Sequence, residues 1–420
     1  MLSGSLSSQF RSKPIKGIII KTMRIAILST HSSPLGRAGS KDTGGMSTYL
    51  RGFSAALGEK GHRVDLFTRS YDAGKDRVLQ VAPNVRLICP ADGQGFLEKD
   101  KLYPHCPAVA DSIERFCRRK KIRYDHIFSH YWLSGVIGNT LQQRWDIPHL
   151  LMFHTLGKAK NESCPGENEP PLRIETEAEL ARSCHLLVAA AESEKKRLLK
   201  YYCLTPEKVA LIPGGIEGSS FYPFELKDSL QAKIRVGGRA NSKIILSVGR
   251  IEPVKGLDLI LKAAALLPAE ANFELFIVGG DDRSSALAAA LKEEAYRLGL
   301  DGKVRFVGVV DHDLLPYYYN AADTTVLASH YESFGLVALE SIACGTPVVA
   351  SPVGVVPELI GANSSIGCLV EQRDPSRWAA AIRRALTGAK PIPRAELEAV
   401  LAPFSWPAAA EKFLAALGAL

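Results

Sequence analysis

The sequence predicts an α/β protein built from two doubly wound, Rossmann-like parallel-sheet domains that face one another across a cleft. Its 420 residues are too many for one ordinary core and fit two domains of about 200 residues each. Short runs of Ile, Val, Leu and Phe alternate with longer segments whose apolar residues recur at helical spacing, which is typical of parallel sheets buried on both faces. The alternation breaks once, between Pro213 and Pro223, and then starts again.

The apolar runs before the break predict the strands of the first sheet. They are Arg24–Ser29, Arg63–Thr68, Val85–Pro90, Asp125–Ser129, His149–His154, His185–Ala190 and Val209–Pro213. Segments such as Ser47–Lys60 lie between them and predict helices; this one is stopped by Gly61, since glycine readily takes the backbone conformation that ends a helix.

The runs after the break predict a second sheet of the same kind. They are Lys243–Gly249, Phe273–Gly279, Val304–Gly308, Thr324–Ser329, Pro347–Ser351 and Cys368–Val370. We therefore expect a first domain over residues 23–222, a second over 223–405, and a last helix over 406–420 that returns to the first domain. Residues 1–22 are expected to be a disordered or artefactual extension, because the strand pattern begins at Met23.

Charge and cysteine usage narrow the class of protein. The formal net charge is +8, and residues 1–22, with four basic residues and no acid, contribute half of it. The remaining surplus is mild, so it suits small anionic substrates and does not by itself indicate nucleic acid. The eight cysteines include no Cys-x-x-Cys pair, which argues against a disulfide framework or a zinc site and favours a reducing, cytoplasmic location. No run approaches the roughly eighteen apolar residues that span a bilayer, although the basic extension leaves peripheral membrane contact open.

Two glycines mark the first candidate binding element. Gly44 and Gly45 come just before a predicted helix, where free backbone N–H groups can approach an anion such as a diphosphate. An ordinary strand–helix turn would explain the same pair.

Polar residues at the ends of first-domain strands form a second candidate group. His130 and Tyr131 stand in "FSHYWLSG", and His154 and Thr155 stand in "FHTLGKAKN". Strand ends face the ligand in this architecture, but helix capping or core hydrogen bonds would account for each residue alone. Solvation is the default interpretation of Lys99 and Arg173.

The segment "SVGRIEPVKGLDLI" supplies two cations at the end of a second-domain strand. Arg250 and Lys255 stand five positions apart, so they can grip the two phosphates of a leaving nucleoside diphosphate. Such contacts stabilise the charge that develops as a glycosidic bond breaks.

The segment "SHYESFGLVALESIACGTPVVAS" is the most informative in the chain. Glu332 lies in a predicted loop, and Glu340 lies eight residues later in a helix whose surroundings are small and apolar. The helix start at Phe334, Gly335 and Leu336 offers unpaired N–H groups to phosphate. Glu340 can accept from ribose hydroxyls, and Glu332 can accept from hydroxyls of a sugar near the reacting carbon.

These motifs together resemble the retaining GT-B glycosyltransferases of family 4, over residues 23–406. The most similar subgroup contains sucrose-phosphate synthases and the inositol-phosphate N-acetylglucosaminyltransferases of mycothiol synthesis. "DTGGM" (42–46), "SHYWLSG" (129–135) and "FHTLGKAKN" (153–161) carry that likeness. One departure is "PGGIEG", where Glu217 stands in place of the usual aspartate.

The resemblance implies a role for each candidate residue. The second domain would bind the nucleotide sugar and the first the acceptor. Donor binding would involve Gly44, Gly45, Arg250, Lys255, Phe334, Gly335, Leu336 and Glu340. Glu332 and His154, with Arg250 and Lys255, would act at the reacting sugar. Lys99, Tyr131, Thr155 and Arg173 match positions that hold the phosphate of a phosphorylated acceptor.

The family chemistry implies no metal and no cofactor. The nucleotide-sugar donor is a substrate, and uridine diphosphate is its default nucleotide. Other possibilities remain. Asp281-Asp282 or the triplet at 311–313 would favour metal ligation, although aspartate is also common in turns. A lipid or polysaccharide acceptor, a sugar-nucleotide epimerase and a non-catalytic nucleotide-sugar-binding protein are alternatives, and no Gly-x-Gly-x-x-Gly motif supports a nicotinamide dehydrogenase. The sequence does not identify the sugar, the acceptor or the oligomeric state.

Overall fold

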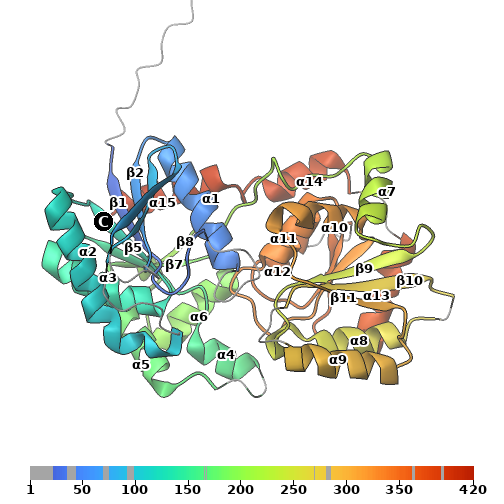
Figure 1. Ribbon diagram of the computed structural model, residues 1–420. Helices are drawn as coiled ribbons and strands as arrows, with labels where there is room; N and C mark the ends of the chain where they lie inside the picture. Colours follow the sequence, from blue (N-terminus) through green and yellow to red (C-terminus); the bar gives the residue numbers. More distant parts are fainter. Residues whose placement is uncertain are drawn as a thin grey trace, which may run out of the picture.

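The computed structural model describes residues 22–35, 44–69, 75–91, 99–164, 166, 168–268, 270–280, 285–361, 365–388 and 392–420. Predictions for residues 1–21, for 42–43 of the "DTGGM" motif and for Asp281-Asp282 lie outside these residues. Figure 1 shows two α/β lobes side by side, the first in blue to green and the second in yellow to orange. None of the described helices combines the length and hydropathy needed to cross a membrane.

The first sheet contains eight strands within the described residues, in the order β3-β4-β2-β1-β5-β6-β7-β8. Every neighbouring pair is parallel except β3 and β4. The strands are β1 (Arg24–Leu28), β2 (Arg63–Phe67), β3 (Arg77–Ala82), β4 (Val85–Cys89), β5 (His126–His130), β6 (His149–Met152), β7 (Leu186–Ala189) and β8 (Val209–Leu211).

Strand β3 was not predicted from the sequence. It pairs with β4 in an antiparallel hairpin at the sheet edge, and its side chains are half-buried or exposed. Because β3 is buried on one face at most, its sequence has no continuous apolar run. It therefore lacks the pattern that is typical of a strand in a parallel sheet. The turn residues Pro83 and Asn84, the latter with φ of 60°, were the available signal for a hairpin.

The second sheet is entirely parallel and has six strands within the described residues, in the order β11-β10-β9-β12-β13-β14. The strands are β9 (Lys243–Val248), β10 (Phe273–Val278), β11 (Val304–Gly308), β12 (Thr324–Leu327), β13 (Val348–Ala350) and β14 (Gly367–Leu369). This is the strand order of a doubly wound nucleotide-binding fold. The predicted fold class is therefore confirmed.

Helices connect the strands in both lobes. In the first they are α1 (Gly45–Glu59), α2 (Cys106–Lys120), α3 (Trp132–Trp145), α4 (Gly157–Ser163), α5 (Pro171–Ser183) and α6 (Glu192–Tyr202), with short turns η1 (Lys99–Lys101), η2 (Tyr103–His105) and η3 (Pro206–Lys208). In the second they are α7 (Leu226–Arg235), α8 (Leu257–Ala265), α9 (Ser285–Arg297), α10 (Leu315–Ala321), α11 (Leu336–Ala343), α12 (Val356–Ile360), α13 (Pro375–Gly388) and α14 (Arg394–Leu401), with turns η4 (Pro253–Lys255) and η6 (His312–Leu314).

The last helix, α15 (Trp406–Leu417), packs on α1 of the first lobe, where Figure 1 shows it in red. The ring of Phe413 lies 5.1 Å from that of Phe53, and the ring of Trp406 lies 5.5 Å from that of Tyr49. Gly52 of α1 makes this contact possible, because a Cβ there would lie 2.2 Å from the Trp406 ring.

The main chain passes between the lobes at two adjacent places. The first follows β8, and the second joins α14 to α15. The Ile216 N–H of one passage donates to the Phe404 carbonyl of the other at 2.9 Å, and Ile216 and Ser405 form a parallel bridge. One hydrophobic cluster also runs through both lobes, including Phe53 and Phe413 of the first and Leu339 and Val356 of the second.

Candidate active site

Each sheet has one switch point, where the connections that follow two neighbouring parallel strands run to opposite sides of the sheet. Polar residues lie at the strand ends at both switch points. In the first sheet the point lies between β1 and β5, where His130 ends β5 and Tyr131 follows. In the second it lies between β9 and β12, with Arg250 after β9 and Glu332 after β12. Ligands of doubly wound sheets bind outside the carboxyl ends of the strands at such points.

Lys255 and Glu332 form an ion pair at the switch point of the second sheet. The Lys255 Nζ lies 2.6 Å from Glu332 Oε1, and Ser329 Oγ donates to the same oxygen at 2.7 Å. The two charged side chains are only 18% and 15% exposed, so solvent screens their attraction weakly. Arg250 turns elsewhere, with its Nη1 2.7 Å from Glu252 Oε1 and its side chain 58% exposed. The structure therefore brings Lys255 to Glu332 and leaves Arg250 outside that contact.

Glu340 is buried in the second turn of α11 and is held on both carboxylate oxygens. Tyr319 donates to Oε2 at 2.7 Å, and His312 Nε2 lies 3.1 Å from Oε1. Burial and the neighbouring carboxylate raise the pKa of Tyr319, so its phenol stays protonated and donates. The sequence predicted Glu340 as a site residue but neither of its partners. His312 belongs to the triplet at 311–313, whose only functional interpretation from the sequence is a metal site.

The start of α11 lies against the first lobe. Gly335 caps this helix with φ of 101°, a left-handed conformation that favours glycine. A Cβ on Gly45 would lie 3.2 Å from Leu336 Cδ1, and a Cβ on Gly214 would lie 2.9 Å from the Phe334 ring. Gly45, one of the two predicted donor glycines, thus meets the start of α11 at the seam between the lobes, while no described atom lies within 4 Å of a Cβ placed on Gly44.

The four residues predicted for an acceptor phosphate lie together around the ring of Tyr131. The Lys99 Nζ lies 5.1 Å and the Arg173 guanidinium carbon 5.0 Å from the ring centroid. Arg173 Nη2 donates to the carbonyl of Thr155 at 2.8 Å and to its Oγ1 at 3.0 Å. The Tyr131 hydroxyl is buried and has no partner among the described atoms.

His31 joins this cluster and was not predicted. It follows β1, and its ring centroid lies 4.2 Å from that of Tyr131. Burial, followed by the charge of Lys99, lowers the pKa of His31, so the ring is neutral. Its position after the first strand was the available signal.

Arg173 and Lys99 differ in how free they are to bind a ligand. The Arg173 side chain is 2% exposed, and its Nη1 and Nε bond Glu169 at 2.8 Å and Glu177 at 2.7 Å. With Thr155 included, nearly all of its donors are used. Lys99 has no ion pair with a described carboxylate, so its ammonium is the more available cation of the two.

His130 and His154 come from the ends of neighbouring strands and contact one another. His130 Nδ1 lies 2.7 Å from His154 Nε2. Burial lowers the pKa of His154 to about 3, and it also lowers the pKa of His130. Both rings are therefore neutral near pH 7.

The lobes are tied together beside these residues. Leu156, two residues after His154, donates its N–H to the Tyr331 hydroxyl at 3.2 Å. Tyr331 directly precedes Glu332, so this bond joins the His154 loop to the Glu332 loop. Ser193 of α6 donates to the Gly354 carbonyl at 3.0 Å along the same seam.

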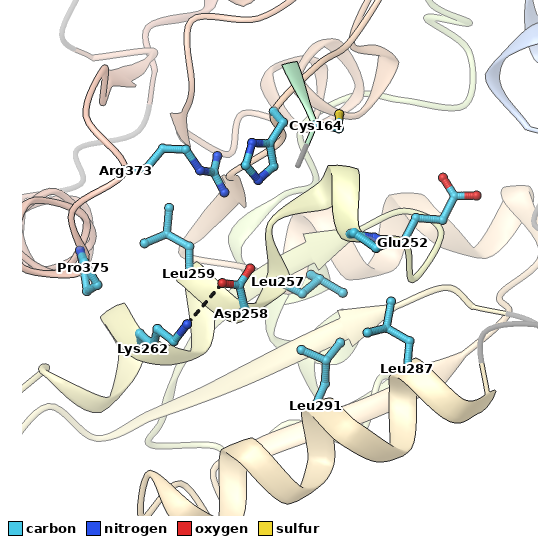
Figure 2. A pocket seen from close by; sticks show the side chains of 12 residues that line it. Cys164, Glu252, Leu257, Asp258, Leu259, Lys262, Leu287, Leu291, Arg373 and Pro375 are labelled. Carbon is cyan, nitrogen blue, oxygen red and sulfur yellow. Dashed lines mark hydrogen bonds and ion pairs between the residues drawn. The ribbon is translucent and has the colours of Figure 1, made fainter. Parts of the chain in front are cut away.

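A cavity of about 560 Å³ lies between η4, α8 and α9 (Figure 2). Asp258, bonded to Lys262, faces it together with Arg373, while Leu257, Leu287 and Leu291 form its apolar side. Glu252, the partner of Arg250, belongs to its wall, and Cys164 reaches it from the first lobe. None of the sequence-predicted site residues lines it.

The described residues include no group of three or more His, Cys, Asp or Glu side chains that could hold a metal ion. Asp311 and Asp313 lie at the start of η6, where Asp311 is the N-cap residue.

Two doubly wound sheets that meet at the carboxyl ends of their strands define the GT-B class of glycosyltransferases. A family model described as Glycosyltransferase Family 4 matches residues 43–219, and one described as Glycosyl transferases group 1 matches residues 231–398. The predicted class and the predicted resemblance are confirmed.

Relatives place the chain more narrowly. It is 35% identical over 403 residues to the D-inositol 3-phosphate glycosyltransferase of Geodermatophilus obscurus, covering 94% of this chain and 88% of that one. It is 37% identical over 384 residues to the protein of the same name from Acidothermus cellulolyticus, covering 89% and 84%. The structure of sucrose-phosphate synthase from Thermosynechococcus elongatus is similar with a TM-score of 0.84 at 30% identity, covering 94% and 98%. The chain belongs to the family 4, group 1 glycosyltransferases and is an enzyme of that class.

Proposed function

We propose that this enzyme transfers a hexosyl unit from a UDP-sugar, either UDP-glucose or UDP-N-acetylglucosamine, to a hydroxyl of a phosphorylated polyol or sugar. The observation that carries the proposal is the cluster of Lys99, Tyr131, Thr155 and Arg173 in the lobe opposite the Lys255–Glu332 pair. The relatives are named for inositol 3-phosphate and for sucrose phosphate. Inositol 3-phosphate is therefore the first acceptor to test.

The acceptor phosphate would bind mainly to Lys99 and Tyr131. Lys99 has no ion pair with a described carboxylate, and the Tyr131 hydroxyl is a buried donor that has no partner among the described atoms. A phosphate oxygen satisfies both, because it accepts from the phenol and neutralises the ammonium. Arg173 would add a background positive charge and hold Thr155 in place through the two bonds it already donates.

The donor would lie along the second lobe. Glu340, fixed by Tyr319 and His312, accepts from the ribose hydroxyls, and the first turn of α11 with Gly45 receives the diphosphate. Lys255 exchanges its contact with Glu332 for a phosphate oxygen, and Arg250 swings from Glu252 to reach the other phosphate. Glu332 then accepts from the hydroxyls of the transferred sugar.

The reaction would retain the anomeric configuration without a protein nucleophile. The bond between the anomeric carbon and the diphosphate oxygen breaks, and the acceptor hydroxyl oxygen bonds to the same carbon on the same face. The released diphosphate takes the hydroxyl proton. Lys255 and Arg250 stabilise the charge that grows on the leaving group, so we propose that no metal is needed and that activity persists in excess EDTA.

The proposal is tested by measuring UDP release from both UDP-sugars with inositol 3-phosphate, fructose 6-phosphate, inositol and fructose. We expect release only with a phosphorylated acceptor, and an α-linked product by NMR when the donor is α-linked. Release that is equally fast with an unphosphorylated acceptor would overturn the phosphate part of the proposal. Release only with a lipid or polysaccharide acceptor would overturn the acceptor class while leaving the transferase intact.

Lys99→Ala and Lys101→Ala provide a matched pair within η1. Lys101 is exposed and has no contact with the Tyr131 ring, whereas Lys99 lies beside it. We expect Lys99→Ala to raise the KM of the phosphorylated acceptor by about 10-fold or more, since a charged hydrogen bond is lost, and to leave the KM of the UDP-sugar unchanged. Lys101→Ala should change neither. Equal effects of the two substitutions would contradict the assignment of Lys99.

A further inference from the structure

His130 has no role in the proposed reaction, yet its environment is unusual. Its side chain is fully buried at the end of β5, with its ring 4.2 Å from that of Phe128 and 5.7 Å from that of Tyr49. Its Nδ1 lies 2.7 Å from His154 Nε2, and its Nε2 has no partner among the described atoms. A buried polar side chain with one partner and one unpaired nitrogen needs an explanation.

The backbone holds the two rings in register. His130 lies opposite Met152 in the β5–β6 ladder, and His154 follows two residues later with φ of 59°. Left-handed backbone is uncommon for a residue with a side chain and persists where the surroundings fix it. His154 is therefore held in a strained conformation, and its ring meets that of His130.

The pair shares a single proton at the contact. Burial keeps both rings neutral near pH 7, and a neutral imidazole carries one N–H. If His154 Nε2–H donated, His130 would bury its own Nε2–H without a partner. If His130 Nδ1–H donates, the unpaired atom is only a lone pair. Buried N–H groups without a partner are the rarer case, so the second arrangement is favoured.

We propose that His130 is a positioning residue that donates its Nδ1–H to His154 Nε2 and so keeps the proton of His154 on Nδ1. His154 then presents an N–H donor, rather than a lone pair, to a hydroxyl oxygen of the transferred sugar. The sugar contact rests on the proposed function, whereas the tautomer rests on the contact between the two rings, on their burial and on the unpaired Nε2 of His130. A lone pair at that atom would accept instead of donate, so the same ring would bind a different set of hydroxyl orientations.

Three substitutions of His130 separate this role from simple packing. The amide of His130→Asn stands two bonds from Cβ, as Nδ1 does, and can donate to His154 from the same place. The amide of His130→Gln stands one bond farther out, near the position of Nε2, and His130→Phe offers no donor. We expect His130→Asn to keep kcat within about 3-fold, and the other two to lower kcat by about 10- to 100-fold through misorientation. The Kd of UDP should be unchanged in all three.

The tautomer of His154 is measured directly by NMR on active protein in which the histidines are labelled with ¹⁵N. Two-bond ¹H–¹⁵N correlation spectra distinguish a protonated from an unprotonated ring nitrogen, and the loss of a signal in His154→Phe assigns His154. We expect His154 to be protonated on Nδ1 in the wild type and in His130→Asn. Protonation on Nε2 in the wild type overturns the proposal, as does an equal fall in kcat for His130→Asn and His130→Gln.

The failure of this inference is distinguishable from failure of the proposed function. If no sugar is transferred to any phosphorylated acceptor, the function is wrong, and the tautomer measurement still decides the role of His130. If transfer occurs and His154 carries its proton on Nε2, the function stands and the positioning role is wrong.

Discussion

Lys255 and Glu332 join two segments that are 77 residues apart in the chain and that serve opposite ends of one bond in the proposed reaction. The ammonium is the group expected at the leaving phosphate, and the carboxylate is the group expected at the transferred sugar. Their 2.6 Å contact brings the two side chains to one place, as the proposed reaction requires. Ser329 donates to the same Glu332 oxygen, so the carboxylate would keep one hydrogen bond when Lys255 turned to phosphate in the proposed reaction.

Replacing Lys255 should act on the chemical step more than on folding. We expect Lys255→Ala to lower kcat by about 10²- to 10³-fold, as the loss of one preorganised donor does. UDP release gives kcat, and thermal unfolding checks the fold. Lys262→Ala is the control, because its pairing with Asp258 on α8 is exposed and contributes little. Turnover near that of the wild type in a folded Lys255→Ala protein would remove Lys255 from the mechanism.

The two side chains that hold Glu340 should matter for nucleotide affinity. We expect Glu340→Gln to weaken UDP binding by about 10-fold or more, because hydrogen bonds to a charged group are lost. Tyr319→Phe should weaken it less, since His312 still bonds Oε1. Isothermal titration calorimetry of both variants, with UDP and with 2′,3′-dideoxy-UDP, measures these affinities. If Glu340 holds the ribose, Glu340→Gln loses the preference for UDP over the dideoxy compound; a retained preference would contradict the role.

Gly52 should be intolerant of alanine although it lies within a helix. Alanine normally stabilises a helix relative to glycine, but a Cβ here would lie 2.2 Å from the Trp406 ring. We expect Gly52→Ala to lower the free energy of unfolding by about 1–3 kcal/mol through overpacking. Gly388, which ends α13 and where a Cβ would meet no described atom within 4 Å, is the matched position. Urea unfolding of both variants measures this difference. An unchanged midpoint for Gly52→Ala would contradict the prediction and would mean that α15 moves away from the added methyl group at little cost.

Acid should destabilise the protein through its buried histidines. Burial lowers the pKa of His149 from 6.5 to about 3, so the unfolded chain takes up a proton as pH falls through 6.5 and the folded chain does not. Stability from this group is therefore present above pH 6.5 and is lost below it, by about 2 kcal/mol between pH 7 and pH 5. His149→Gln places an amide, which can donate or accept, near the position of Nε2, which lies 2.8 Å from Ser129 Oγ, and it removes the titration.

The difference between wild type and His149→Gln is the quantity to measure, by urea unfolding at pH 5, 6 and 7. Glu194, whose pKa burial raises to about 7, acts in the opposite direction and cancels in that difference. We expect the variant to lose less stability on acidification. Parallel pH dependences would contradict a neutral, buried His149.

Most of the fold followed from the sequence because parallel strands buried on both faces leave continuous apolar runs, as in Ile25–Leu28 and Leu275–Val278. Strand β3 did not, because its half-exposed edge position requires no such run. The order of the strands within each sheet depends on which strands pair, and the sequence of a single strand does not determine its neighbours. The pairing of β9 with β12 is the example on which the site depends.

The site residues were recognised by type and spacing, and their contacts were not. Spacing placed Lys255 and Glu332 at two strand ends but said nothing of their ion pair, because the ends become neighbours only in the sheet. The partners of Glu340 come from α10 and η6, which the sequence does not connect to α11. Arg173 was expected to be solvated or to bind phosphate, and its buried bonds to Glu169 and Glu177 required the structure. The roles of all these residues stay predictions.

Because α15 returns to α1, the second lobe is an insert within the first rather than an appendage to it, and the hydrogen bond between Ile216 and Phe404 joins the two ends of that insert. A fragment that ends before α15 would lack Trp406 and Phe413, and with them part of the core around Phe53. The first lobe could thus be produced alone as a chain in which residue 216 is linked directly to residue 404 in place of the second lobe. Any rotation of one lobe relative to the other would therefore have its hinge at these two adjacent, hydrogen-bonded passages.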